Sequence, residues 1–222
     1  MERPPYRHSE AILKMRKSFY LWTRDLHLYF GLFISPFVLV FAASVFFLNH
    51  GWAPWAANPT AIRSVQDLRI PMGMEKLQGP ALVRQIRPVL DQLAITGEIA
   101  YIRSLPKEHR MIVPVSVPGR ETTVDLRLDN RSATVTERKT GIWSAVVYLH
   151  KSPGPHNTAI RGNWPFTRIW KWLADATVYL LLFISASGIY LWVVLRAERR
   201  IGLILMGAGA LSFFGVVYGL CF

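Results

Sequence analysis

The chain has 222 residues and a formal net charge of +12, yet 51% of its residues are hydrophobic and its mean hydropathy is +0.23. A basic nucleic-acid-binding protein spreads cations over its whole surface, whereas this chain contains three long stretches without any charged residue. The composition excludes a disordered chain, an ordinary cytosolic enzyme and a nucleic-acid partner. The single cysteine, Cys221, excludes an intrachain disulfide and a multi-cysteine metal site.

The N-terminal part predicts a basic flank followed by a membrane span. Residues 1–25 contain six lysine and arginine residues against three acidic residues, which places them in the cytoplasm by the positive-inside rule. No charged residue occurs from 26 to 62, and about 20 apolar residues suffice to cross a membrane. We therefore predict a first transmembrane helix at 26–49, uncleaved because it exceeds the apolar core of a signal peptide, with a kink at Pro36.

Residues 50–168 are predicted to form an extracytoplasmic domain and a segment that re-enters the membrane. Apolar residues spaced three or four apart predict an amphipathic helix at 79–94, in spite of Pro88. A period of two then predicts four strands, and residues 141–150 return to a helical pattern. One helix on a small antiparallel sheet is an α+β domain. The predicted strands are 98–105, 110–117, 122–129 and 133–138.

The C-terminal part predicts two further spans joined by a short turn. Uncharged stretches support transmembrane helices at 169–195 and 201–222, and three arginines mark the turn at 196–200 as cytoplasmic. The C-terminus then lies outside the cytoplasm. The outer part of the chain retains 17 cations against 10 acidic residues, a surplus of +7 that favours an anionic ligand, lipid headgroups or a partner.

Four histidines near the predicted membrane faces are the candidate ligands. Two imidazoles that face each other across a helix bundle bind the iron of b-type haem. His50 and His150 return to the outer face and form the first candidate pair, with His156 as the alternate ligand. His27 lies at the inner face, where a site would need Met206, a second copy or a partner protein to complete it.

Neighbouring residues fit a haem site but also have simpler interpretations. Small residues leave room for a porphyrin at Ser187 and Gly188 and at 42–44, and Lys151, Arg161 and Arg168 are candidates to meet its propionates. Interfacial histidines are often only polar anchors, however, and small residues in membrane spans more often pack helices. Gly215 and Gly219 stand at such a packing spacing, and Asp175 fits the first turn of a helix.

Several short motifs together resemble the PepSY-associated transmembrane helix (PepSY_TM-like) proteins of bacterial inner membranes. They are LWTRDLHLYFGL, FFLNH, YLHK and SGIYLW, which occur in that order between about residues 21 and 200. The resemblance implies a membrane α-helical protein with three transmembrane helices and a small extracytoplasmic α+β PepSY-like domain. Related members look like haem-bearing reductases of ferric chelates, and His27, His50 and His150 are the positions that match their axial ligands.

Two functions follow as expectations. The first is a multi-pass protein of the bacterial inner membrane that binds haem b through His50 and His150 and transfers electrons to an extracytoplasmic acceptor such as a ferric chelate. The second is a non-catalytic accessory or assembly subunit, which binds a partner membrane complex or a peptidase through its PepSY-like domain. Three spans rather than four or more depart from the reductase pattern, so homo-oligomerisation is one way to complete an electron path. Membrane lipids are expected partners in either case.

Overall fold

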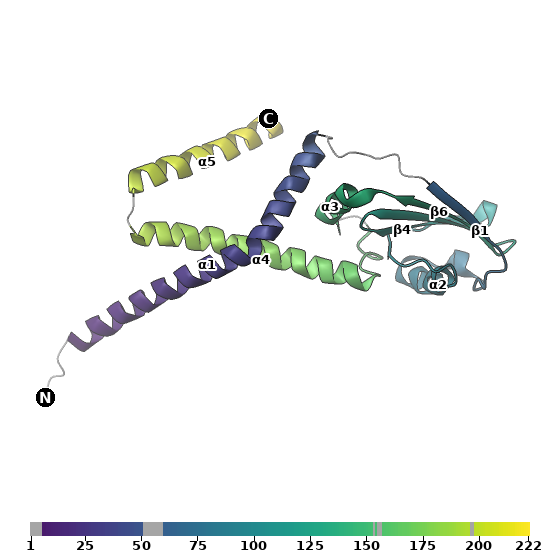
Figure 1. Cartoon of the computed structure of the whole chain (residues 1–222), viewed down its shortest axis with the longest axis horizontal. Coiled ribbons are helices and arrows are strands. Elements are labelled where there is room, and N and C mark those ends of the chain that lie inside the picture. Colours follow the sequence, from purple (N-terminus) through teal and green to yellow (C-terminus); the bar gives the residue numbers. More distant parts are fainter. Residues whose placement is uncertain (1–5, 51–59, 153, 155–156, 196–197) are drawn as a thin grey trace. The chain divides into compact units, whose positions relative to one another are not determined.

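A computed structural model of the chain describes residues 6–50, 60–152, 154, 157–195 and 198–222 (Figure 1). They divide into two compact units, of which one contains the chain up to Pro36 together with Ala176–Phe222, and the other contains Phe37–Asp175. Two long helices, α1 and α4, contribute to both units. The boundary in α1 follows Pro36, the proline inside that helix.

Within the described residues, three helices are long and apolar enough to cross a membrane, which confirms the predicted number of spans. They are α1 (Tyr6–His50), α4 (Pro165–Leu195) and α5 (Arg199–Cys221). The chain is therefore a multi-pass membrane protein. Helix α1 begins well before the predicted span because neither glycine nor proline interrupts the sequence between Tyr6 and Gly31.

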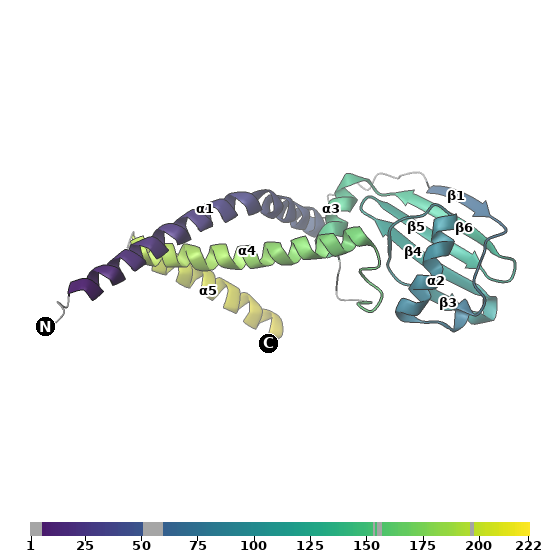
Figure 2. The same cartoon turned by 90° about the horizontal axis from the view of Figure 1, so that it is seen from below.

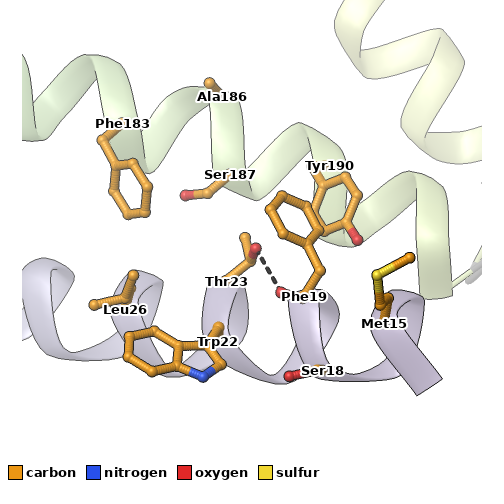
Figure 3. Close-up of a pocket in the computed structure, with 10 residues that line it drawn as sticks. All are labelled: Met15, Ser18, Phe19, Trp22, Thr23, Leu26, Phe183, Ala186, Ser187 and Tyr190. Carbon is orange, nitrogen blue, oxygen red and sulfur yellow. Dashed lines mark hydrogen bonds between the residues drawn. The ribbon is translucent and has the colours of Figure 1, made fainter. Parts of the chain in front are cut away.

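Aromatic side chains pack α1 against α4 in the unit that contains both ends of the chain (Figure 3). Phe19 and Tyr190 meet edge to face with ring centroids 5.3 Å apart, and Phe30 meets Phe183 in the same way at 5.5 Å. The start of α5 approaches α4 at Gly202, where a Cβ atom would overlap the indole ring of Trp192.

The other unit contains a mixed α+β domain whose sheet is antiparallel throughout its described pairings. Its strands follow the order β1-β6-β5-β4-β2, and β3 also pairs with β4. Helix α2 (Gly79–Gln92) lies across one face of the sheet (Figure 2), and α3 (Gly141–Lys151) follows the last strand. The strands are β1 (Thr60–Val65), β2 (Glu98–Ile99), β3 (Arg103–Leu105), β4 (Arg110–Val117), β5 (Arg120–Arg127) and β6 (Ser132–Lys139).

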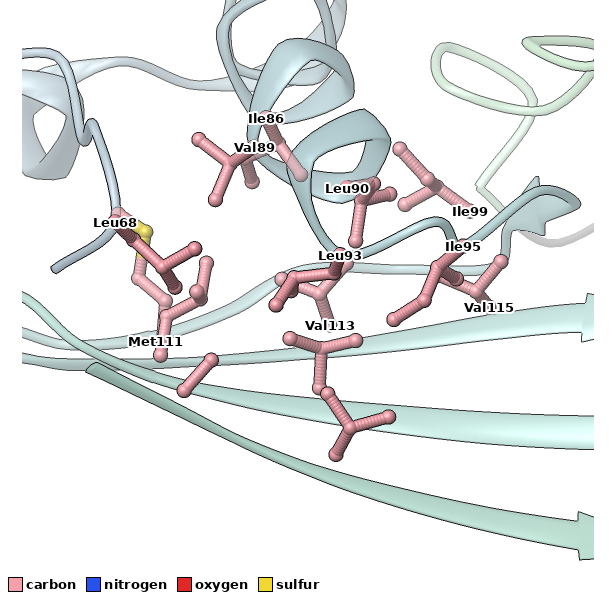
Figure 4. Close-up of a cluster of buried hydrophobic side chains, with 14 of the residues drawn as sticks. Leu68, Ile86, Val89, Leu90, Leu93, Ile95, Ile99, Met111, Val113 and Val115 are labelled. Atoms are coloured by element: carbon pink, nitrogen blue, oxygen red, sulfur yellow. The ribbon is translucent and has the colours of Figure 1, made fainter. Parts of the chain in front are cut away.

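The core of this domain forms between α2 and the sheet (Figure 4). Ile86, Val89 and Leu90 are fully buried on one side of α2, as the spacing of three and four predicts. Met111 and Val113 alternate on β4 and point toward them. Each such side chain contributes roughly 1.5–3 kcal/mol through burial, so the match of the two periodicities accounts for the stability of this layer.

The structure refines the predicted elements in two places. The predicted strand 98–105 is two short strands, β2 and β3, separated by residues 100–102. Strand β1 was not predicted: it pairs with β6 at the edge of the sheet, and five of its six residues are exposed, so it lacks a clear hydrophobic alternation. Helices α2 and α3 and strand β4 lie where the sequence pattern places them.

Candidate functional site

His27 of α1 forms a hydrogen bond with a serine on another helix. Its Nδ1 lies 2.8 Å from the Oγ of Ser187 in α4. The serine hydroxyl donates to the carbonyl of Ile184 at 3.2 Å, so the oxygen is left to accept from the Nδ1–H of His27. This arrangement assigns the proton to Nδ1 and leaves the lone pair on Nε2, the atom that a histidine uses to bind a metal when its other nitrogen is held.

His27 occupies the space that small residues open in α4. A Cβ atom at Gly188 would lie 3.5 Å from the Cε1 of His27, an ordinary contact distance. Ser187 is only 5% exposed. The small residues at 187 and 188, which the sequence suggested as room for a porphyrin, thus receive the imidazole itself.

His150 of α3 repeats the same hydrogen-bonding pattern with α1. Its Nδ1 lies 2.8 Å from the Oγ of Ser44, and that hydroxyl donates to the Phe41 carbonyl at 2.6 Å. Ser44 is 1% exposed. The ring of Phe41 packs edge-on against the imidazole with centroids 5.4 Å apart. Nδ1 of His150 is therefore also the donor, and its Nε2 keeps a lone pair.

Trp170 at the start of α4 supports the surroundings of His150. Its indole Nε1 donates to the carbonyls of Leu149 at 3.0 Å and Ser152 at 3.3 Å, at the C-terminal end of α3. Its ring also lies 5.9 Å from that of Phe41. These contacts bind α3, α1 and α4 together around one imidazole within the same compact unit.

His50, the other predicted outer ligand, lies on a different side of α1 from Ser44. Its Nδ1 donates to the Phe46 carbonyl at 3.0 Å, its ring lies 4.4 Å from that of Phe46, and the residue is exposed. Six residues separate Ser44 from His50, which turns their side chains roughly 120° apart around a helix. The pairing of His50 with His150 stays a prediction, and His156 lies outside the described residues.

The predicted cationic partners differ in their surroundings. Lys151 and Arg168 are exposed, whereas Arg161 is half-buried. Among the described residues, the buried Nε of Arg161 has no hydrogen-bond partner. Burial raises the pKa of the Tyr148 hydroxyl, and the charge of Arg161 acts in the opposite direction. Arg161 is thus the predicted cation that keeps an unpaired buried donor.

Other predicted positions make few contacts within the described chain. Met206 is exposed on α5, and Asp175 is exposed on α4. Apart from the neighbouring residues and the backbone of α5 itself, no described atom would lie within 4 Å of a Cβ atom at Gly215 or Gly219. In the ranges that the structure describes, no three histidine, cysteine or carboxylate side chains gather as a metal site. Each histidine–serine pair therefore supplies one ligand rather than a complete coordination sphere.

A buried polar network, which the sequence analysis did not identify, fixes the segment that leads into α4. The fully buried carboxylate of Glu98 accepts the backbone N–H of Gly162 at 2.6 Å and of Trp164 at 3.0 Å. The side chain of Asn163 pairs with both backbone groups of Ile99, accepting its N–H at 3.0 Å and donating to its carbonyl at 2.9 Å. The amide of Asn163 thus extends β2 as a strand neighbour would.

Arg87 of α2 completes this network from the other side. Its guanidinium donates to the Gly97 carbonyl at 2.9 Å and to Oδ1 of Asn163 at 2.5 Å. The alternating pattern that predicts a strand at 98–105 does not distinguish a buried Glu98 from an exposed one. The RGNW sequence at 161–164, with a glycine and an asparagine before a helix, is the signal that could have indicated a built turn.

Ion pairs on the sheet engage two of the domain's cations. Arg110 forms a two-bond pair with Asp125, and the carboxylate raises the pKa of that guanidinium. Arg138 donates to Glu121 at 2.6 Å. Both ion pairs join neighbouring strands, so these two cations stabilise the sheet through cross-strand contacts.

Comparison with known proteins identifies the family. A family model described as "Putative PepSY_TM-like" matches residues 21–222, so the chain belongs to that family. No curated protein matches the chain. No solved structure matches it either.

Proposed function

We propose, from the premise that this chain is a PepSY_TM-like protein, that it binds b-type haem in the bacterial inner membrane and transfers electrons to an extracytoplasmic acceptor such as a ferric chelate. The basic flank 1–25 and the turn 196–200 then lie in the cytoplasm. The sheet domain and the C-terminus lie on the opposite side.

The observation that carries this proposal is the pair of histidine–serine hydrogen bonds, His27 with Ser187 and Ser44 with His150. In both, the serine oxygen accepts from Nδ1–H, which orients the ring and leaves Nε2 available. An imidazole held at Nδ1 with Nε2 available is the arrangement that metal-ligating histidines use. The two pairs involve residues near opposite ends of the apolar part of α1.

The residues present would supply one ligand to the haem iron at each end. When bound, haem b supplies one-electron redox chemistry. At the outer end His150 is the oriented ligand, His50 and His156 are the candidates for the second, and the unpaired Nε of Arg161 suits a propionate. At the inner end His27 is the oriented ligand. Its partner would come from Met206, a second copy or another protein.

The surface charge of the sheet domain supports an anionic acceptor. The outer part of the chain carries 17 cations against 10 acidic residues. Asp125 and Glu121 each pair with one cation on the sheet, which leaves the net surplus of +7 unchanged, and this surplus raises the local concentration of an anionic chelate. The role of the domain in this proposal is to attract the acceptor, while the histidines hold the redox group.

The test is the reduced-minus-oxidised visible spectrum of the full chain, purified from membranes of cells supplied with haem. A six-coordinate haem gives a sharp α-band, which we expect to weaken in His27→Ala and in His150→Ala. His50→Ala tests the predicted second outer ligand. His109→Ala is the matched control, because His109 lies between η2 (Pro106–Glu108) and β4 of the sheet domain.

A folded preparation that takes up no haem would contradict the proposal. If that colourless protein is isolated in fixed ratio with another membrane complex or a peptidase, the accessory-subunit function replaces it. If the spectrum is unchanged by all three histidine substitutions, the haem is held elsewhere and the oriented imidazoles have another role.

A further inference from the structure

An open apolar groove lies between α1 and α4 in the unit that contains both ends of the chain (Figure 3). Its volume is about 790 Å³, within the range of small-molecule sites. Phe19 and Tyr190 meet edge to face toward one end, and Leu26 and Phe183 lie at the other. The groove is lined by Met15, Ser18, Phe19, Trp22, Thr23, Leu26, Phe183, Ala186, Ser187 and Tyr190.

The two most enclosed hydroxyls along this groove are already satisfied. Thr23 donates to the Phe19 carbonyl at 2.8 Å, and Ser187 is shared between Ile184 and His27. A ligand in the part of the groove beside Thr23 and Ser187 therefore needs no polar atoms there. His27 is not among the described residues that line the groove, although Ser187, its hydrogen-bond partner, is.

A second pocket of about 680 Å³ continues the groove and is cationic. It shares Met15, Phe19 and Tyr190 with the apolar part and adds Arg16 of α1 and Arg199 at the start of α5. Its described lining contains no acidic residue. Two guanidinium groups thus stand at one end of an apolar channel, close to the ends of three spans.

We propose that this groove binds one anionic glycerophospholipid. Its phosphate lies between Arg16 and Arg199, and an acyl chain extends past Tyr190 and Phe19 toward Phe183. Guanidinium groups bind phosphate oxygens through paired hydrogen bonds, and basic pockets between membrane helices suit anionic headgroups. The division of the groove into an apolar and a cationic part matches the division within the lipid.

Charge also decides between a lipid and a second copy of the chain in this groove. A second copy would bring its own basic flanks, with six cations in residues 1–25, to the level of Arg16 and Arg199. Like charges at that level oppose association, whereas a phosphate neutralises both guanidinium groups. The lipid is therefore the occupant that the charges favour.

The test compares the association of spin-labelled phosphatidylglycerol and phosphatidylcholine with the full chain in phosphatidylcholine vesicles. We expect wild type to prefer phosphatidylglycerol. In the Arg16→Gln, Arg199→Gln double variant the preference falls roughly tenfold. The matched control is the Lys17→Gln, Arg200→Gln double variant, which removes the same charge at adjacent positions that do not line the groove and should retain the preference.

A second substitution tests the apolar part without changing charge. Ala186→Trp fills the groove and should reduce the association of phosphatidylglycerol, whereas Leu182→Trp, at an exposed position on the same helix, should not. Circular dichroism verifies that both variants keep their helices. The lipid readout does not depend on haem.

Three results would overturn the proposal. One is an equal loss of preference in the Arg16→Gln, Arg199→Gln variant and in the Lys17→Gln, Arg200→Gln control. Such a result would indicate that general surface charge, rather than the groove, determines the preference. Another is an unchanged preference in Ala186→Trp. The third is a dimer that Ala186→Trp dissociates while the lipid preference stays, which would assign the groove to a second copy.

Discussion

Nδ1 of His27 lies 2.8 Å from Oγ of Ser187, although 160 residues separate them in the sequence. The same distance joins Ser44 and His150, which are 106 residues apart. In each pair the serine hydroxyl donates its only proton to a backbone carbonyl of its own helix. The two serines thereby determine which imidazole nitrogen carries the proton, and this is a more specific role than filling space beside a cofactor.

Under the proposed haem binding, replacing either serine should weaken the affinity for haem without removing the ligand. Ser187→Ala and Ser44→Ala leave Nδ1–H without its acceptor, and loss of such a supporting hydrogen bond lowers metal affinity by roughly 10–100-fold. Titration of the haem-free protein, followed by its absorbance, measures the change. Ser35→Ala is the control, because the Ser35 hydroxyl donates only to the Leu32 carbonyl of the same helix among the contacts described. Equal affinities in all three variants would contradict a positioning role.

The elements built on local periodicity were predictable from the sequence. The spacing at 79–94 gave α2, and the alternation at 110–117 gave β4, because each has one face in the core and one outside it. The three spans followed from the absence of charge. Strand β1 was missed because an exposed edge strand imposes little constraint on its residues.

The site depended on contacts that no local pattern encodes. The sequence marks Ser44 and Ser187 only as small residues, whereas their hydrogen bonds require the pairing of residues more than 100 positions apart. The burial of Glu98 was also not predictable, since a carboxylate in a strand is usually exposed. It is buried because two backbone N–H groups of the 162–164 segment satisfy it.

Gly97 should tolerate no side chain. Its φ of +144° disfavours other residues, and a Cβ there would lie 2.8 Å from methyl groups of both Val115 and Val117. Gly97→Ala should destabilise the sheet domain by roughly 1–3 kcal/mol. The measurement is protection of the β4 amides against hydrogen exchange in the full chain.

Gly73→Ala separates the two causes at position 97. Gly73 also has a positive φ, of +75°, but open space surrounds its Cβ position. A smaller loss of protection is expected there, about 1 kcal/mol from the backbone alone. If the two variants lose the same amount, crowding by Val115 and Val117 contributes nothing.

Glu98 should be replaceable by neither alanine nor glutamine. In Glu98→Gln an amide NH₂ faces one of the two N–H donors of Gly162 and Trp164, so one buried donor loses its acceptor. The expected cost is about 1–3 kcal/mol. Hydrogen exchange at residues 162 and 164 should rise together with a lower unfolding temperature. Glu121→Gln, at an exposed ion pair, should change neither quantity appreciably, and normal exchange at 162 and 164 in Glu98→Gln would refute the assignment.

Tyr148 should make the domain sensitive to alkaline pH. Burial raises the pKa of its hydroxyl above the ordinary value of 10.0, against smaller lowering effects from the hydrogen bond to Ser152 and the charge of Arg161. Folding therefore favours the neutral form. The resulting stability is fully present below pH 10.0 and is lost as the pH rises through the higher pKa of the folded state.

The comparison of wild type with Tyr148→Phe isolates this contribution. At neutral pH the variant should unfold at a lower temperature, because it lacks the hydrogen bond with Ser152. Above pH 10.0 the wild type loses the stability that depends on the neutral hydroxyl, so the difference in unfolding temperature should shrink. Near-ultraviolet circular dichroism follows the transition, and Tyr101→Phe, at an exposed tyrosine, controls for loss of a hydroxyl. A difference that stays constant across this range would show that the Tyr148 hydroxyl titrates alike in the folded and unfolded states.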